Sequence, residues 1–209
     1  MKRFVTISST TVVAAILVLL ALSALLPTAL PLRVVQAAAD HVRWDIQSFN
    51  AATTPPTSSP GGFAIASARN SPALLSIKLM GSGTFVGPAS GGTSSGVTGG
   101  GTWETFSDMT STGSGTYEVV ELVSWTFSTF QTGTFIDNID HGTRANGVAV
   151  FRIRYSDGSD GILGVGCDGP NAPPGTLEGV IASKGSVTYW DAQAPVGGVD
   201  ANRTIFHIM

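Results

Sequence analysis

The sequence has little cysteine and little charge, and each shortage narrows the class of protein. Cys167 is the only cysteine among 209 residues, so no internal disulfide can form, and no cysteine near the N-terminus could carry a lipid. Cys167 itself is expected to be a small buried hydrophobe or a free thiol open to pairing between molecules. Charged residues make up only 12% of the chain. An apolar core rather than cross-links must therefore stabilise the fold.

The first 39 residues have the composition of an export signal peptide. Two basic residues precede an apolar run over residues 12–22, and small residues at positions 35–39 provide a cleavage site. The alternative is an uncleaved membrane anchor over residues 11–32, a stretch long enough to cross a hydrocarbon core about 30 Å thick. We therefore expect a secreted, extracellular protein or, in the alternative, one anchored to the outer face of a membrane.

The charge balance argues against a polyanionic partner. Lys2, Arg3 and Arg33 lie in the leader, which has no acidic residue, so residues 40–209 keep 8 of the 11 basic residues against all 14 acidic ones, a net charge of −6. Nucleic acids and anionic membrane surfaces are bound by basic faces. We expect neither a nucleic acid nor, once the leader is cleaved, a membrane as the partner.

Residues 40–62 are expected to form a short strand followed by a linker. Val42, Trp44 and Ile46 alternate with polar residues, which is typical of a half-buried strand. Residues 51–62 contain three prolines and almost no apolar side chain, which predicts a linker or a long mobile loop without ladder pairing. The remainder, residues 63–209, reads as one glycine-rich all-β domain.

The pattern beyond residue 62 is that of antiparallel β-structure. Apolar residues alternate with polar ones along several segments, and the Asp-Gly pairs of residues 156–161 are a strong hairpin signal. Residues 73–80 could begin a helix after Pro72, but their alternation favours a strand. We predict an all-β, antiparallel meander of roughly 8–9 strands. Closure into a small β-barrel is preferred over a two-sheet sandwich, because closure removes exposed strand edges.

One polar loop between two expected strands is the best candidate for catalysis. Asp137, Asp140, His141 and Arg144 place two carboxylates, an imidazole and a guanidinium close together in the sequence. A histidine beside a carboxylate can act as a general base near neutral pH. The alternative is a solvated connection whose acids cap turns, so the sequence alone leaves the role of this loop open.

A second set of residues could bind a ligand. Arg152 and Arg154 share one face of an expected strand, whereas Glu121 interrupts the apolar side of residues 115–129, which also carry Trp125. If the arginines face the interior, they need Glu121 or a bound anion as partner, because an unpaired buried charge is costly. If they face outward, they are ordinary surface residues. The aromatic residues expected in the core rather than on a sugar-stacking platform are Trp103, Tyr117, Trp125, Phe127 and Trp190.

Several short motifs of enzymes and of nucleotide- or metal-binding proteins occur, but each lacks the neighbouring residues or structure that its function requires. Residues 92–96 match the Gly-x-Ser-x-Gly string of hydrolases and residues 164–169 match a dinucleotide-binding string, but neither is followed by the helix that the chemistry needs. Asp157, Ser159 and Asp160 lack the downstream glutamate of a calcium loop. The three histidines are too dispersed for a zinc motif. No cofactor or metal site is predicted.

Three functions stay open. The first, which we favour, is a non-catalytic binding module for a small apolar molecule or a glycan. The second is an enzyme that needs no cofactor, an isomerase, cyclase or hydrolase using the polar loop. The third is a structural surface protein. An apolar cavity would support the first, a polar pocket around His141 and Arg144 the second, and a filled interior the third.

Overall fold

The computed structural model describes residues 40–88, 92–195 and 201–209, and these contain strands and turns but no helix. The prediction of an all-β fold is thus confirmed. The signal peptide and the alternative anchor expected within residues 1–39 lie outside the described residues. Within the described residues, no helix has both the length and the hydropathy that a transmembrane span requires.

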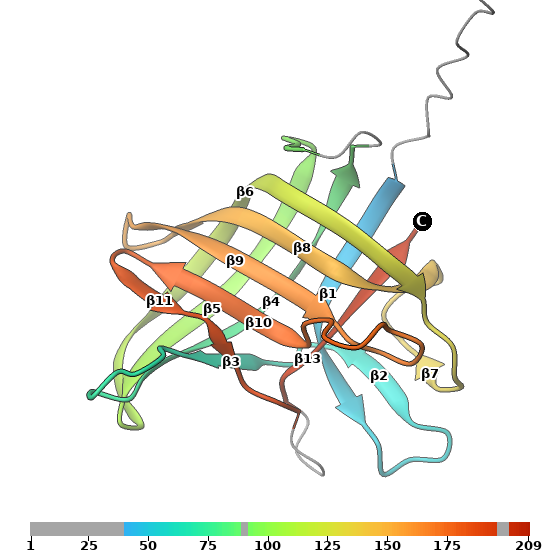
Figure 1. Ribbon diagram of the computed structural model, residues 1–209, viewed down its shortest axis with the longest axis horizontal. Coiled ribbons are helices and arrows are strands. Elements are labelled where there is room, and N and C mark those ends of the chain that lie inside the picture. Colours follow the sequence, from blue (N-terminus) through green and yellow to red (C-terminus); the bar gives the residue numbers. More distant parts are fainter. Residues whose placement is uncertain (1–39, 89–91, 196–200) are drawn as a thin grey trace, which may run out of the picture. The chain divides into compact units, whose positions relative to one another are not determined.

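The described residues form thirteen strands of one sheet (Figure 1). The strands are β1 (Asp40–Asn50), β2 (Thr57–Pro60), β3 (Ala64–Ser67), β4 (Leu75–Gly87), β5 (Val97–Ser107), β6 (Thr110–Phe130), β7 (Ile136–Asp137), β8 (Thr143–Tyr155), β9 (Asp160–Cys167), β10 (Gly179–Lys184), β11 (Val187–Tyr189), β12 (Asp191–Ala192) and β13 (Arg203–Ile208).

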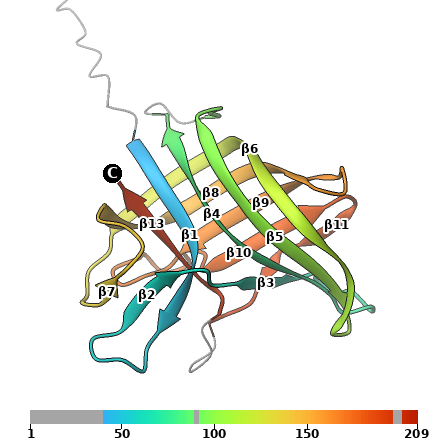
Figure 2. The same cartoon turned by 180° about the vertical axis from the view of Figure 1, so that it is seen from behind.

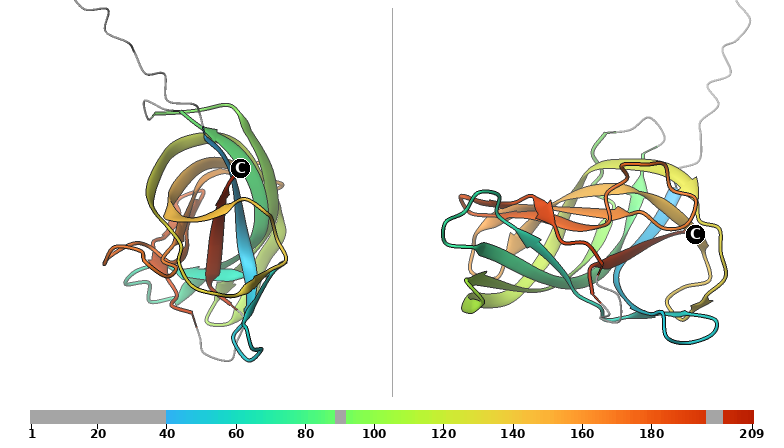
Figure 3. Two further views of the ribbon diagram at one scale, coloured as in Figure 1. Left: turned by 90° about the vertical axis from the view of Figure 1, so that its right-hand side faces the viewer. Right: turned by 60° about the horizontal axis from the view of Figure 1, so that its bottom comes forward.

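The strands pair mostly with their neighbours in sequence, and β13 adds long-range pairs. The main path through the sheet runs β11-β10-β9-β8-β6-β5-β4-β1-β2-β7. Because β13 pairs with both β1 and β8, hydrogen bonds connect β1, β4, β5, β6, β8 and β13 in a continuous circuit. The end-on view in Figure 3 shows the strands curving around a common interior.

The sheet is branched, so it is not a clean barrel. β1 pairs with β2, β4 and β13, whereas β4 pairs with β1, β3 and β5. β8 likewise pairs with β6, β9 and β13. Figure 2 shows β2 and β3 running in opposite directions in the lower part of this arrangement. The finding therefore supports a many-stranded sheet and leaves the predicted barrel unconfirmed.

Aromatic side chains fill the interior. The Trp44 and Phe151 rings lie 5.4 Å apart between centroids, and Phe85 packs edge-on against Phe151 at 5.6 Å. Trp125 and Phe206 pack at 4.8 Å. Such pairs add to the free energy gained by burying the rings themselves. Other large core side chains are Ile46, Ile77, Leu79, Trp103, Tyr117, Leu122, Ile153, Tyr155 and Leu163.

Glycines allow the paired strands β4 and β5 to lie close to each other and to the core. Gly83 pairs with Gly99 in the β4–β5 register. A Cβ atom on Gly83 would lie 2.2 Å from the carbonyl oxygen of Thr98 and 2.9 Å from Nε1 of Trp44. Only a residue without a side chain therefore fits between the neighbouring strand and the indole ring. The glycine richness of this region is a packing requirement of the core.

The predicted linker over residues 51–62 is wrong for Thr57–Pro60. This segment is strand β2, which pairs antiparallel with β1 and parallel with β7. Backbone pairing needs no apolar side chain, and the prolines do not interrupt it because Pro55 and Pro56 precede the strand and Pro60 ends it.

The expected regular alternation along residues 115–129 is also wrong in its second half. The pairing of β6 with β8 shifts at three places, the first between Val119 and Glu121. Each such irregularity changes which side chains face inward. Tyr117 and Leu122 are buried, but Phe127 is 41% exposed and Trp190, also expected in the core, is 60% exposed. By contrast, the predicted strand after Pro72 and the hairpin around residues 156–161 are confirmed as β4 and as β8–β9.

Candidate functional site

The polar loop predicted as a catalytic site is attached to the outer face of β1 and β13. Oδ2 of Asp137 forms a hydrogen bond with Nε2 of His207 at 2.8 Å, although His207 is fully buried. Oδ2 of Asp140 lies 3.5 Å from Nη1 of Arg43 on β1. The imidazole that meets a carboxylate is therefore that of His207, 70 residues away in sequence, and not that of His141.

The remaining two predicted residues, His141 and Arg144, form neither of these contacts with β1 and β13. His141 is exposed and lines a polar hollow of 310 Å³ formed by residues 137–141. Arg144 stacks its guanidinium over the Phe135 ring at 3.9 Å and donates to the carbonyl oxygen of Gly133 at 3.0 Å. The structure thus gathers Asp137, Asp140 and His141 around one hollow but does not bring Arg144 to it.

The carboxylate oxygens of this network all have partners among the described residues. Asp137 and Asp140 each accept a backbone N–H through Oδ1, from Ile139 and Gly142 respectively. Arg43 donates twice to Asp45, at 2.7 and 3.0 Å. Burial raises the pKa of Asp45 despite that pairing, whereas the N–H of Gly142 lowers the pKa of Asp140. These contacts secure the loop to the sheet.

The arginines of β8 face outward. Nε of Arg152 lies 3.2 Å from Oε2 of Glu121, and Nε of Arg154 lies 3.1 Å from Oδ1 of Asp160. Both arginines are exposed, so these are surface ion pairs of small energetic weight. Trp125 lies on the other side of the sheet, where its ring packs against Phe85 and Phe206.

Two further polar residues lie near the end of β9: Cys167, its last residue, and Glu178, which accepts a hydrogen bond from the N–H of Asp168. The sequence did not indicate that they lie close together. Cys167 is buried and donates to the carbonyl oxygen of Thr204 at 3.2 Å, which confirms the buried alternative for this residue. Burial raises the pKa of its thiol, so it is a poor nucleophile. Burial also raises the pKa of Glu178 to about 7. In the part of the chain that the structure describes, no group of three or more His, Cys, Asp or Glu residues could hold a metal ion.

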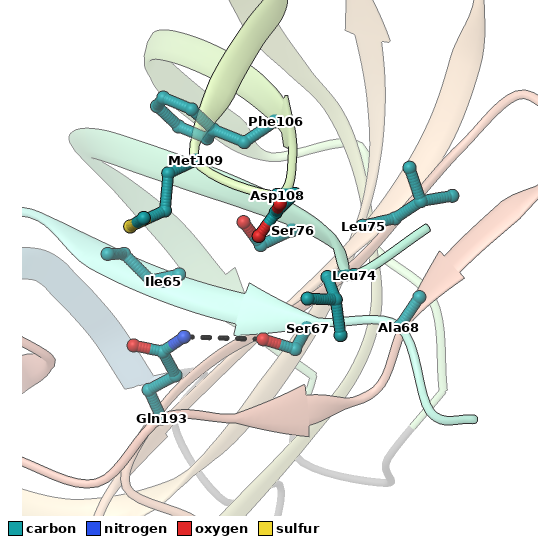
Figure 4. A pocket seen from close by; sticks show the side chains of 10 residues that line it. All are labelled: Ile65, Ser67, Ala68, Leu74, Leu75, Ser76, Phe106, Asp108, Met109 and Gln193. Atoms are coloured by element: carbon teal, nitrogen blue, oxygen red, sulfur yellow. Dashed lines mark hydrogen bonds between the residues drawn. The ribbon is translucent and has the colours of Figure 1, made fainter. Parts of the chain in front are cut away.

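A largely apolar hollow lies outside the core, on the outer face of β3, β4 and β5. We call it the outer hollow; it has a volume of 390 Å³. Ile65 and Ser67 face it, whereas the alternating Ala64 and Ala66 face the core. Its lining residues are Ile65, Ser67, Ala68, Leu74, Leu75, Ser76, Phe106, Asp108, Met109 and Gln193 (Figure 4).

Two loops that are joined to each other form the rim of the outer hollow. The N–H of Asp108, in the turn between β5 and β6, donates to the carbonyl oxygen of Leu74 at 3.4 Å. The hydroxyl of Ser107 donates to the carbonyl oxygen of Ala73 at 2.9 Å. Across the hollow, Nε2 of Gln193 donates to the hydroxyl of Ser67 (Figure 4). These hydrogen bonds therefore fix the positions of the segments that form the rim.

Two apolar side chains on this rim occupy unfavourable backbone positions. Leu74 has φ +47° and is 63% exposed, and Met109 has φ +65° and is 90% exposed. Glycine, asparagine and aspartate are the residues that accept this left-handed conformation at low cost. Neither side chain gains core burial in return. Strained positions of this kind are concentrated at ligand-binding sites.

Comparison with protein-family models, with curated proteins and with solved structures found no match to this chain.

Proposed function

We propose that this protein is a non-catalytic module that binds a small apolar molecule in the outer hollow. The observation that carries the proposal is the pair of apolar side chains, Leu74 and Met109, held exposed and at positive φ beside a hollow of 390 Å³. Ligand pockets typically enclose about 300–1,000 Å³ and are lined mainly by apolar groups with a few polar ones. Ile65 and Phe106 complete the apolar lining.

The proposal includes the scaffold that the sequence favours. The circuit of hydrogen-bonded strands supports a small barrel rather than two separate sheets. Aromatic side chains fill the interior of that scaffold, which is the outcome expected of a structural protein. The binding proposal therefore rests on the outer hollow alone, and the ligand would bind there and not inside the scaffold. Export through the N-terminal leader would bring the module to an extracellular ligand.

Replacing Met109 by glycine separates a binding role from a structural one. Glycine accepts φ +65° without strain, so Met109→Gly should raise the free energy of unfolding by about 0.5–1 kcal/mol. The same change removes apolar surface from the rim. We expect it to weaken binding of the neutral fluorescent probe N-phenyl-1-naphthylamine by about fivefold, as the loss of roughly 1 kcal/mol of apolar contact would give.

Asn171→Gly is the matched control, because Asn171 also has positive φ but does not line the outer hollow. It should leave probe affinity unchanged. If the wild-type protein shows no saturable binding of the probe, or if Met109→Gly binds it as well as the wild type, the proposal is wrong and a structural role becomes the better account.

A further inference from the structure

We infer that the ligand of the outer hollow joins an apolar body to a positively charged group, as a primary ammonium compound does. This inference rests on the proposed function and specifies the ligand class. It follows from one side chain, Asp108, which is the only charged residue among the ten that line the hollow.

The Asp108 carboxylate is available to a ligand. It forms no hydrogen bond or ion pair with any described residue, whereas its own N–H is used to join the turn to Leu74. Ser76 on β4 also lines the outer hollow (Figure 4). These two side chains offer acceptor oxygens next to an apolar surface, which suits an ammonium group with three N–H donors.

The two basic side chains near the outer hollow, those of Lys78 and Arg69, interact with other residues. Nζ of Lys78, the next outward-facing residue after Ser76 on β4, lies 4.9 Å from the centroid of the Phe63 ring. Arg69 lies 3.9 Å from Asp191. Neither residue lines the hollow. An anionic ligand would thus meet an unpaired carboxylate and no basic partner, whereas a cationic one would meet an oppositely charged group.

Ligands of equal length and different charge test the inference. Octylammonium, 1-octanol and octanoate share one alkyl chain, and each is used to displace N-phenyl-1-naphthylamine from the full chain at low ionic strength. We expect octylammonium to bind roughly two- to fivefold more tightly than 1-octanol, the range expected for an exposed ion pair, and octanoate to bind most weakly. Added salt should reduce the advantage of octylammonium.

Asp108→Asn is the decisive variant. Asparagine accepts the φ of +47° at this turn, so the fold and the shape of the hollow are kept while the charge is removed. The variant should bind octylammonium no better than 1-octanol. Glu118→Gln, which removes an exposed carboxylate from β6 away from the hollow, should keep the wild-type preference.

The outcomes separate the inference from the proposed function. If all three ligands displace the probe equally, or if octanoate binds best, the inference is wrong while the binding module stands. The same holds if Asp108→Asn keeps the preference for octylammonium. If neither the probe nor any of the three ligands binds saturably, the proposed function is wrong and the inference falls with it.

Discussion

Glu178 joins two distant parts of the chain through one carboxylate. Its Oε2 accepts the N–H of Asp168 at 2.6 Å, just after β9, and its Oε1 accepts the N–H of Thr204 at 3.0 Å, on β13. Both bonds favour the ionised form, but burial outweighs them and raises the pKa to about 7. The folded protein therefore holds a proton on Glu178 that the unfolded chain releases near its ordinary pKa of about 4.3.

The stability of the protein should depend on pH through Glu178. Because the folded pKa is raised, the stabilisation is fully present below the unfolded pKa and is lost as the pH rises to about 7. Replacing Glu178 by glutamine removes this titration. We expect the free energy of unfolding of the wild type, measured relative to Glu178→Gln by urea denaturation, to fall between pH 5 and pH 7 and to level off above. A difference that rises with pH would contradict the assignment.

The strap formed by residues 131–142 shows how one element depends on a few polar contacts. β7 lies within it and pairs with β2, and Asp137 and Asp140 attach it to His207 and Arg43. Nδ1 of His207 has no hydrogen-bond partner among the described residues. The bond from Nε2 to Asp137 is therefore the one that compensates this buried ring.

Removing that bond should loosen the strap and lower stability. Asp137→Ala leaves the buried imidazole without a partner for either nitrogen, which should cost about 1–3 kcal/mol in urea denaturation. Asp137→Asn keeps an acceptor oxygen and should cost less. Thr134→Ala, at an exposed position of the strap, serves as the control. Hydrogen exchange over residues 131–142 should speed up in Asp137→Ala alone. Equal exchange in all three variants would show that the bond does not hold the strap.

Within a single strand, the sequence predicts which side chains point into the core only where the strand pairing is regular. Ala149, Phe151, Ile153 and Tyr155, which lie at alternate positions in the sequence, all face inward, because β8 pairs with β9 without a shift. The irregular pairing of β6 could not be read from its residues, since it depends on the partner strand. The contact between Asp137 and His207 was equally hidden, because only the fold brings β7 and β13 together.

For the molecule as a whole, the circuit of paired strands makes distant segments depend on one another. β13 supplies Phe206 to the core and pairs with strands on both sides. Without it, β1 and β8 would present unpaired edges around an opened interior. The outer hollow is built on β3, β4 and β5, and because β4 and β5 are themselves members of this circuit, the hollow depends on it directly.

Deleting residues 203–209 should abolish cooperative folding of the whole domain. We expect the full chain to show a single thermal transition in far-ultraviolet circular dichroism and the truncated chain to lose it, because the core loses Phe206 and two strands lose a partner. Deleting Met209 alone, an exposed residue beyond β13, is the control and should have little effect. A truncated chain that melts as the full one does would show that β13 is dispensable.

The class of fold could be predicted, but the candidate site could not. Alternation and hairpin signals suffice to indicate β-structure, and they do not reveal that β1 would take three partners. The outer hollow depends on the φ angles of Leu74 and Met109 and on the register that sets Ser67 beside Ser76. An Asp-Met pair at a tight turn, where Asp-Gly is usual, was the one signal in the sequence that could have pointed to it.

The pairing of β1 with β13 also has a consequence for biosynthesis. A ribosome or a translocation channel releases the N-terminal strand long before its late partner, so β1 must wait with one edge uncovered while the rest of the domain is made. During that interval Trp44 and Ile46 lack the residues that lie opposite them in the pairing, Phe206 and Thr204. Chaperones that hold unfolded chains would therefore be needed most at this stage.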